Sequence, residues 1–101
     1  MTQSDPIICL FNAVDIEDRE YLVRFVSGFF GAHWVIATFI RHAFVGMEPW
    51  VRTWNRNFDK RSDALAYARG RLGRMMKKGY KVDPKNTNQV LYQEVMNAGK
   101  K

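Results

Sequence analysis

The spacing of apolar residues changes once along this chain, near residue 60, and that change restricts the fold to few classes. Before it, four stretches alternate in polarity or run continuously apolar, as β-strands do. After it, Leu65, Ala68, Leu72, Met75 and Met76 recur at helical spacing and form one apolar stripe. Consecutive strands followed by a helix indicate an α+β fold. The 101 residues, 47% of them hydrophobic, suffice for one such domain with a core.

The predicted strands are residues 7–11, 19–26, 33–42 and 49–58, joined by short connections. In the second strand Tyr21, Val23 and Phe25 share a face, and the acidic stretch "AVDIEDRE" before it is predicted to be a loop. Pro49 limits pairing at the start of the fourth strand. Short connections between successive strands predict a four-stranded antiparallel meander with one long helix packed on it.

The long helix is predicted to begin at Ser62, an N-cap residue, with Asp63 in its first turn. Gly79 is placed to end it, after lysines that suit the negative end of the helix dipole. Gly70 and Gly73 are poor helix formers, so we expect them to lie where another element packs closely.

The remaining segment fits a short second helix over residues 88–97, with Val90, Leu91, Val95 and Tyr92 as its apolar contacts. Residues 1–5 and 98–101 are expected to be frayed ends of a single domain spanning residues 1–101.

Charge divides the chain into two unlike halves. Residues 1–50 hold 3 Lys/Arg against 6 Asp/Glu, whereas residues 51–101 hold 13 against 4. The second half therefore predicts a basic surface, which favours polyanions.

Cysteine content and hydropathy bear on location. Cys9 is the only cysteine and no secretion signal precedes it, so a reducing, cytoplasmic setting is expected. The uncharged stretch 25–40 is shorter than the roughly 20 residues of a membrane-spanning helix and contains Gly28 and Gly31. Two strands around a turn explain it better, and no membrane partner is expected.

The fourth strand, "WVRTWNRNF", places large aromatic residues and arginines on one face: Trp50, Arg52, Trp54, Arg56 and Phe58. Two interpretations stay open. Exposed rings would stack on bases while the guanidinium groups hold phosphates. Alternatively, the Trp rings lie under the helix and the arginines extend outward along their aliphatic stems.

The helix carries a second basic feature, because Arg71, Arg74, Lys77 and Lys78 fall on the side opposite its apolar stripe, with Arg69 nearby. These side chains would track phosphates, or would simply form the solvated side of a helix on a sheet. Binding through such contacts would weaken steeply with salt.

Catalytic patterns are missing from the sequence. His33 and His42 have no paired cysteine or closely spaced carboxylate and are expected at strand ends. "GRLGR" lies inside a helical pattern and is not a phosphate-binding loop. We therefore expect a protein that is not an enzyme and that has no cofactor and no metal site.

Several motifs together resemble the WGR domain, a module of poly(ADP-ribose) polymerases and small bacterial proteins. Over residues 8–81 the matching pieces are "REYLVRFV", "FFGAHW", a loop at Gly46, "VRTWNRNF" and "SDALAYARGRLGRMMKKGY". The closing Lys77, Gly79 and Tyr80 are the most specific part. Where the family has Trp-Gly-Arg, this chain has Phe39-Ile40-Arg41 and retains only the arginine. In the family that motif lies near DNA or a partner domain.

Two functional hypotheses follow. The first is a small non-catalytic domain that binds nucleic acid, DNA rather than RNA because of what the resemblance implies. Its contact residues would be Arg41, Arg52, Trp54, Arg56, Arg71, Arg74, Lys77 and Lys78. The second is a protein-interaction module or inhibitor, encoded by a mobile element or phage, that docks on an acidic protein partner through the same face. Its acidic stretch "DIEDRE" would be a second contact edge. The oligomeric state stays open.

Overall fold

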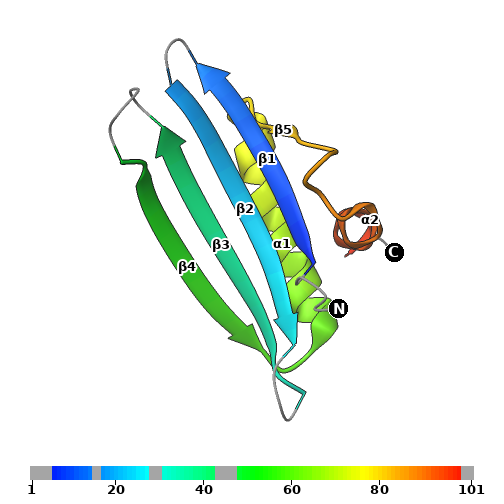
Figure 1. The fold of residues 1–101 in the computed structure, drawn as a ribbon. Coiled ribbons are helices and arrows are strands. Elements are labelled where there is room, and N and C mark those ends of the chain that lie inside the picture. Colours follow the sequence, from blue (N-terminus) through cyan, green and yellow to red (C-terminus); the bar gives the residue numbers. More distant parts are fainter. Residues whose placement is uncertain (1–5, 15–16, 28–30, 43–47, 99–101) are drawn as a thin grey trace.

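A computed structural model shows one antiparallel sheet with both helices on the same side of it (Figure 1). It describes residues 6–14, 17–27, 31–42 and 48–98, except the side chains of 13–14 and 17–18. In chain order the elements are β1 (Ile7–Val14), β2 (Glu17–Ser27), β3 (His33–His42), β4 (Trp50–Phe58), α1 (Arg61–Lys77), β5 (Lys81–Val82) and α2 (Gln89–Asn97). The strand order is β4-β3-β2-β1-β5. The α+β class predicted from the sequence is confirmed.

The predicted meander is right for β1 to β4, and β3 has the predicted bounds. The two-residue strand β5, which was not predicted, pairs with the other edge of β1. The loop prediction for "AVDIEDRE" is wrong over most of its length, because Val14 pairs with Glu17 and Ala13 with Asp18. Backbone pairing continues to the end of this hairpin despite the charged side chains. Residues 15–16, the connections 28–30 and 43–47 with Gly46, and the ends 1–5 and 99–101 lie outside the described residues.

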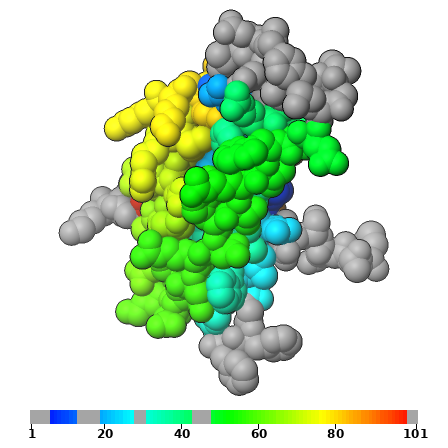
Figure 2. Space-filling view, turned by 90° about the vertical axis from the view of Figure 1, so that its left-hand side faces the viewer, coloured from blue at the N-terminus to red at the C-terminus, as the bar shows by residue number. Residues whose placement is uncertain are grey.

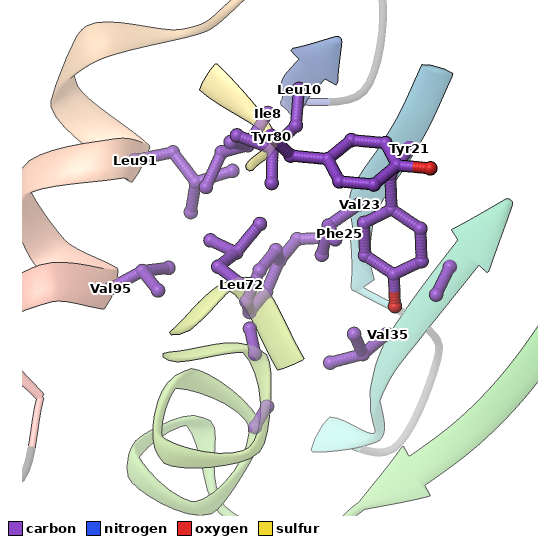
Figure 3. Packing of buried hydrophobic residues seen from close by; sticks show 13 residues of the cluster. Ile8, Leu10, Tyr21, Val23, Phe25, Val35, Leu72, Tyr80, Leu91 and Val95 are labelled. Atoms are coloured by element: carbon purple, nitrogen blue, oxygen red, sulfur yellow. The ribbon is translucent and has the colours of Figure 1, made fainter. Parts of the chain in front are cut away.

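Alternation along the strands determines which side chains form the core. Tyr21, Val23 and Phe25 share a face, as predicted, and that face is turned toward the helices. In the next strand Ala37 lies beside Val23. Leu72 of α1 projects among side chains from the sheet and from α2 (Figure 3). The buried cluster is Ile8, Leu10, Tyr21, Val23, Phe25, Val35, Ala37, Ala64, Ala68, Leu72, Tyr80, Leu91 and Val95.

The N-cap of helix α1 lies two residues earlier than its sequence indicated. Lys60 is the N-cap and makes no side-chain capping bond, so the prediction that Ser62 caps the helix is wrong. Asp63 does lie in the first turn. At the other end Gly79 adopts φ +102°, a conformation that side chains rarely tolerate, and its N–H donates to Met76 O at 3.0 Å. The predicted stop at Gly79 is therefore confirmed.

Gly70 and Gly73 were expected to mark a close approach, and this expectation is wrong. A Cβ at either position would meet no atom within 4 Å. Both glycines instead line a groove of about 440 Å³ between α1 and α2, together with Ala66, Arg69, Met96 and Ala98. Neither steric crowding nor backbone conformation requires glycine at these sites.

We expect Gly70→Ala and Gly73→Ala each to raise the free energy of unfolding by about 0.5–1 kcal/mol, because alanine loses less backbone entropy in a helix. Urea unfolding of the single and double variants measures the effect. As the matched control, Gly79→Ala should destabilise the protein, because its positive φ strains any side chain. Destabilisation by Gly70→Ala would show that an element closes over the groove.

Helix α2 confirms the expected short C-terminal helix. Asn88 caps it, accepting a bond from Leu91 N at 3.0 Å. Leu91 and Val95 are buried and Tyr92 packs against the core, as predicted, but Val90 is 73% exposed and makes no core contact. Among the helices described, neither is long and apolar enough to cross a membrane.

The segment leading to α2 closes the outer edge of β1. Asp83 N donates to Cys9 O and Asn88 N donates to Ile7 O, each at 2.8 Å. Between them, the buried Thr87 hydroxyl accepts from Cys9 N at 2.9 Å and donates to Cys9 O at 3.1 Å. A threonine side chain thereby completes the hydrogen bonding that a neighbouring strand would supply.

Candidate functional site

The face of β4 that combines tryptophan with arginine points toward the helix side of the sheet. Trp54 lies beside the buried Ala37, and Arg56 beside the buried Val35. Because β4 is the edge strand, α1 covers this face only in part, and Trp54 is half-buried against the core. Figure 2 views the molecule from this edge, where β4 in green meets α1 in yellow-green. The interpretation that puts a Trp ring under the helix is therefore correct for Trp54.

Where β4 and α1 meet, arginines alternate with aromatic rings. The Arg52 guanidinium carbon lies 5.0 Å from the Trp54 ring centroid, and the Arg71 carbon lies 5.2 Å from it. Arg71 is also 5.5 Å from the Tyr67 ring, which Arg56 approaches at 5.1 Å. We call this set the basic seam: Arg52, Trp54, Arg56, Phe58, Tyr67 and Arg71. Each such contact is worth about 0.5–2 kcal/mol, depending on how far it is desolvated.

Arg71 is the central member of the seam and the one held most firmly. Its Nε donates to the Tyr67 hydroxyl at 2.9 Å. Partial burial alone would lower the pKa of Arg71, but that bond and its interactions with the hydroxyls of Tyr21 and Tyr67 raise it above its ordinary value. Arg71 is half-buried, so its predicted place on the solvated side of α1 is wrong. It lies on the flank of the helix that meets β4.

Arg52 and Arg56 differ from Arg71 because both are exposed. Their guanidinium groups lie against rings, and no hydrogen bond or ion pair recorded among the described residues uses either one. The two ion pairs recorded there join His42 to Glu20 and Arg61 to Glu94. A cation–π contact uses the charge of a guanidinium group and leaves its N–H groups available to phosphate oxygens.

Further cations extend the seam along α1. Arg74 is exposed. Burial raises the pKa of the Tyr21 hydroxyl, and the nearby charges of Arg71 and Arg74 oppose that rise. Arg74 lies three residues after Arg71, and Lys78 lies four residues after Arg74. These spacings place both cations on the same flank as Tyr67 and Arg71. Lys77 is exposed but lies farther around the helix. Arg69 lies on the other flank, where its Nη1 donates to Ala98 O at 3.0 Å.

Phe39-Ile40-Arg41, which stands where the WGR family has Trp-Gly-Arg, lies at the Arg52 end of the basic seam. Arg41 is exposed at the end of β3 and pairs in register with Trp50. The Trp50 ring makes an edge contact with Phe39, at a centroid distance of 5.7 Å and an angle of 71°. Ile40 points to the opposite face of the sheet.

The structure thus separates the two tryptophans that the sequence left undecided, because Trp50 is 55% exposed whereas Trp54 is half-buried, with two guanidinium groups near its ring. Trp50 was missing from the predicted contact residues although it shares the β4 face. Tyr67 was missed too, although it precedes Arg71 by four residues, the spacing that brings helical side chains together.

The remaining reactive groups lie elsewhere. His33 and His42 are the first and last residues of β3, as predicted. The described residues include no cluster of three or more His, Cys, Asp or Glu side chains suited to a metal ion. Burial, reinforced by the negative charges of Asp83 and Glu20, raises the pKa of Cys9 to about 11. Its thiol is therefore protonated, and a poor nucleophile, near neutral pH.

Comparisons with protein-family models, with curated proteins and with solved structures found no match to this chain, so its resemblance to the WGR domain rests on the quoted motifs alone.

Proposed function

We propose that this protein is a small non-catalytic nucleic-acid-binding domain that holds the phosphate backbone along the basic seam. The observation that carries the proposal is the row of Arg52, Arg71 and Arg56, whose guanidinium carbons lie 5.0 to 5.5 Å from the ring centroids of Trp54 and Tyr67. A row of guanidinium groups suits a polymer of phosphates better than it suits a single anion.

The roles of the individual residues follow from their exposure. Arg52 and Arg56 would contact phosphates directly, whereas the half-buried Arg71 would mainly orient the rings. Arg74, Lys78 and Lys77 on α1 would add attraction along the helix, with Arg41 at the other end. Trp54 would position Arg52 and Arg71, since the guanidinium groups of both lie near its ring. The exposed Trp50 is the better stacking platform for an unpaired base or a duplex end.

Fluorescence anisotropy with a labelled duplex and the matching single strand, each as DNA and as RNA, tests the proposal across a salt series. The Arg52→Gln/Arg56→Gln variant should bind at least about tenfold more weakly at low salt. It should also lower the slope of log affinity against log salt by about two, because two phosphate contacts are removed.

The matched control is Lys81→Gln/Lys85→Gln, which removes the same charge at the β5 edge, across the sheet from β4. We expect it to retain most of the affinity, since screening shortens charge interactions to about 10 Å at 0.1 M salt. Equal weakening by both variants would show that net charge, rather than the seam, drives binding. No binding at low salt would refute the proposal and direct attention to an acidic protein partner. Tighter binding of DNA than of RNA is expected.

A further inference from the structure

The sheet face turned away from the helices carries a patch of apolar side chains. We call it the outer face, and its apolar members are Ile7, Phe11, Leu22, Val26, Trp34, Ile36, Ile40 and Val51, beside the polar Thr38, Thr53, Asn55 and Asn57 and the buried Cys9. Phe11 is 42% exposed, Trp34 38% and Val51 52%. Both helices contribute their buried residues to the opposite face, and no described element covers this one (Figure 1). When one face of an antiparallel sheet meets water, polar residues normally occupy it, so this apolar patch indicates an interface.

The charges within the outer face are arranged symmetrically. Glu20 and Arg24 both lie on β2, the middle strand of the five, on either side of Leu22. Four residues of strand separate them by about 13 Å. Lys81 and His42 lie at the margins. A strand that carries one acid and one base around an apolar centre is complementary to an antiparallel copy of itself.

We propose that a second copy of this chain docks on the outer face, related by a two-fold axis that crosses β2 at Leu22. This operation stacks two sheets at the usual spacing of about 10 Å and places each strand over its own copy in the opposite direction. Glu20 then faces Arg24 of the other copy, Phe11 faces Ile7, and Ile40 faces Ile36. These three pairs are chemically matched, and the same operation sets Trp34 over His42 and Val51 over Asn55.

The same charges argue against other occupants. A polyanion or an acidic peptide that reached Arg24 would also meet the carboxylate of Glu20. The net charge of +6 makes two copies repel one another on average. The basic seam lies on the helix side, so the outer face is a surface on which copies can approach without bringing the two seams into contact.

Sedimentation velocity of the full chain, freed of nucleic acid and followed over a range of concentrations, tests the proposal. We expect a concentration-dependent dimer. Glu20→Arg alone and Arg24→Glu alone should each weaken dimerisation about tenfold or more, because symmetry creates two like-charge contacts in either variant. The double swap Glu20→Arg/Arg24→Glu should restore the wild-type association constant to within about threefold.

Circular dichroism and thermal unfolding of each variant establish that its fold is intact. A wild-type protein that stays monomeric up to its solubility limit would overturn the proposal. If neither single variant weakens dimerisation, the interface lies elsewhere. A double swap that stays as weak as the single variants would disprove the two-fold arrangement. Because these measurements use no nucleic acid, their outcome is independent of the function proposed for the basic seam.

Discussion

Replacing Leu72 with alanine is expected to lower the free energy of unfolding by about 3 kcal/mol, within the range measured for fully buried leucines. Leu72 is 0% exposed and lies in the cluster that joins α1, α2 and the sheet (Figure 3). Removing its side chain loses apolar burial and leaves a cavity lined by three elements, which cannot all collapse at once.

Urea unfolding followed by circular dichroism measures this loss, which would lower the melting temperature of a domain of this size by roughly 12–20 °C. Val90→Ala on α2 is the matched control. Val90 is 73% exposed, so its truncation should change stability by no more than about 0.5 kcal/mol. A loss below about 1 kcal/mol for Leu72→Ala would mean that α2 is not packed as described.

The second large effect concerns the edge of β1. Thr87→Val keeps the shape of the side chain but removes the hydroxyl that bonds both Cys9 N and Cys9 O. Asp83 N still reaches that carbonyl, so the buried Cys9 N–H is the group left without a partner. We expect a loss of about 2–3 kcal/mol, since an unsatisfied buried donor costs its desolvation in addition to the bond.

Thr87→Ser is the matched control, because it keeps both hydrogen bonds and loses one methyl group, worth about 1 kcal/mol. Hydrogen exchange gives a local measurement, in which the Cys9 amide should exchange faster in the valine variant. If valine proves as stable as threonine, the C-terminal segment does not contribute to the edge of β1.

Elements with a strong periodic signal were predicted well from the sequence. β3 is uninterrupted and alternates around Val35 and Ala37, and its bounds came out as predicted. Gly79 required a positive φ and marked the end of α1 correctly. The two-residue strand β5 gave no periodic signal, because its place depends on pairing with β1, which is distant in sequence. The start of α1 was misjudged since Ser62 suits a cap by propensity, whereas the turn after β4 sets where the helix begins.

Of the candidate site, the β4 face was predicted from the sequence, but the contribution of α1 was not. The alternation of β4 placed Trp54, Arg52 and Arg56 on one face, and the structure agrees. The sequence did not indicate that Arg71 would turn toward β4, because the rotation of α1 over the sheet follows from how Ala64, Ala68 and Leu72 fill the core. Tertiary packing therefore created the alternation of rings and guanidinium groups, which neither element shows alone.

The two edges of the sheet are covered to different extents, and this difference affects solubility. One edge of the sheet is the two-residue strand β5 and the C-terminal segment beside β1, whereas the other is the nine-residue strand β4, whose backbone groups can pair with a neighbouring molecule. Exposed edges of this kind promote strand addition and fibril growth. Two copies joined along β4 would bring Arg52 and Arg56 of each chain into one line, and the resulting repulsion opposes that growth. The arginines proposed to contact nucleic acid would thus also oppose aggregation, and their neutral variants need light-scattering controls.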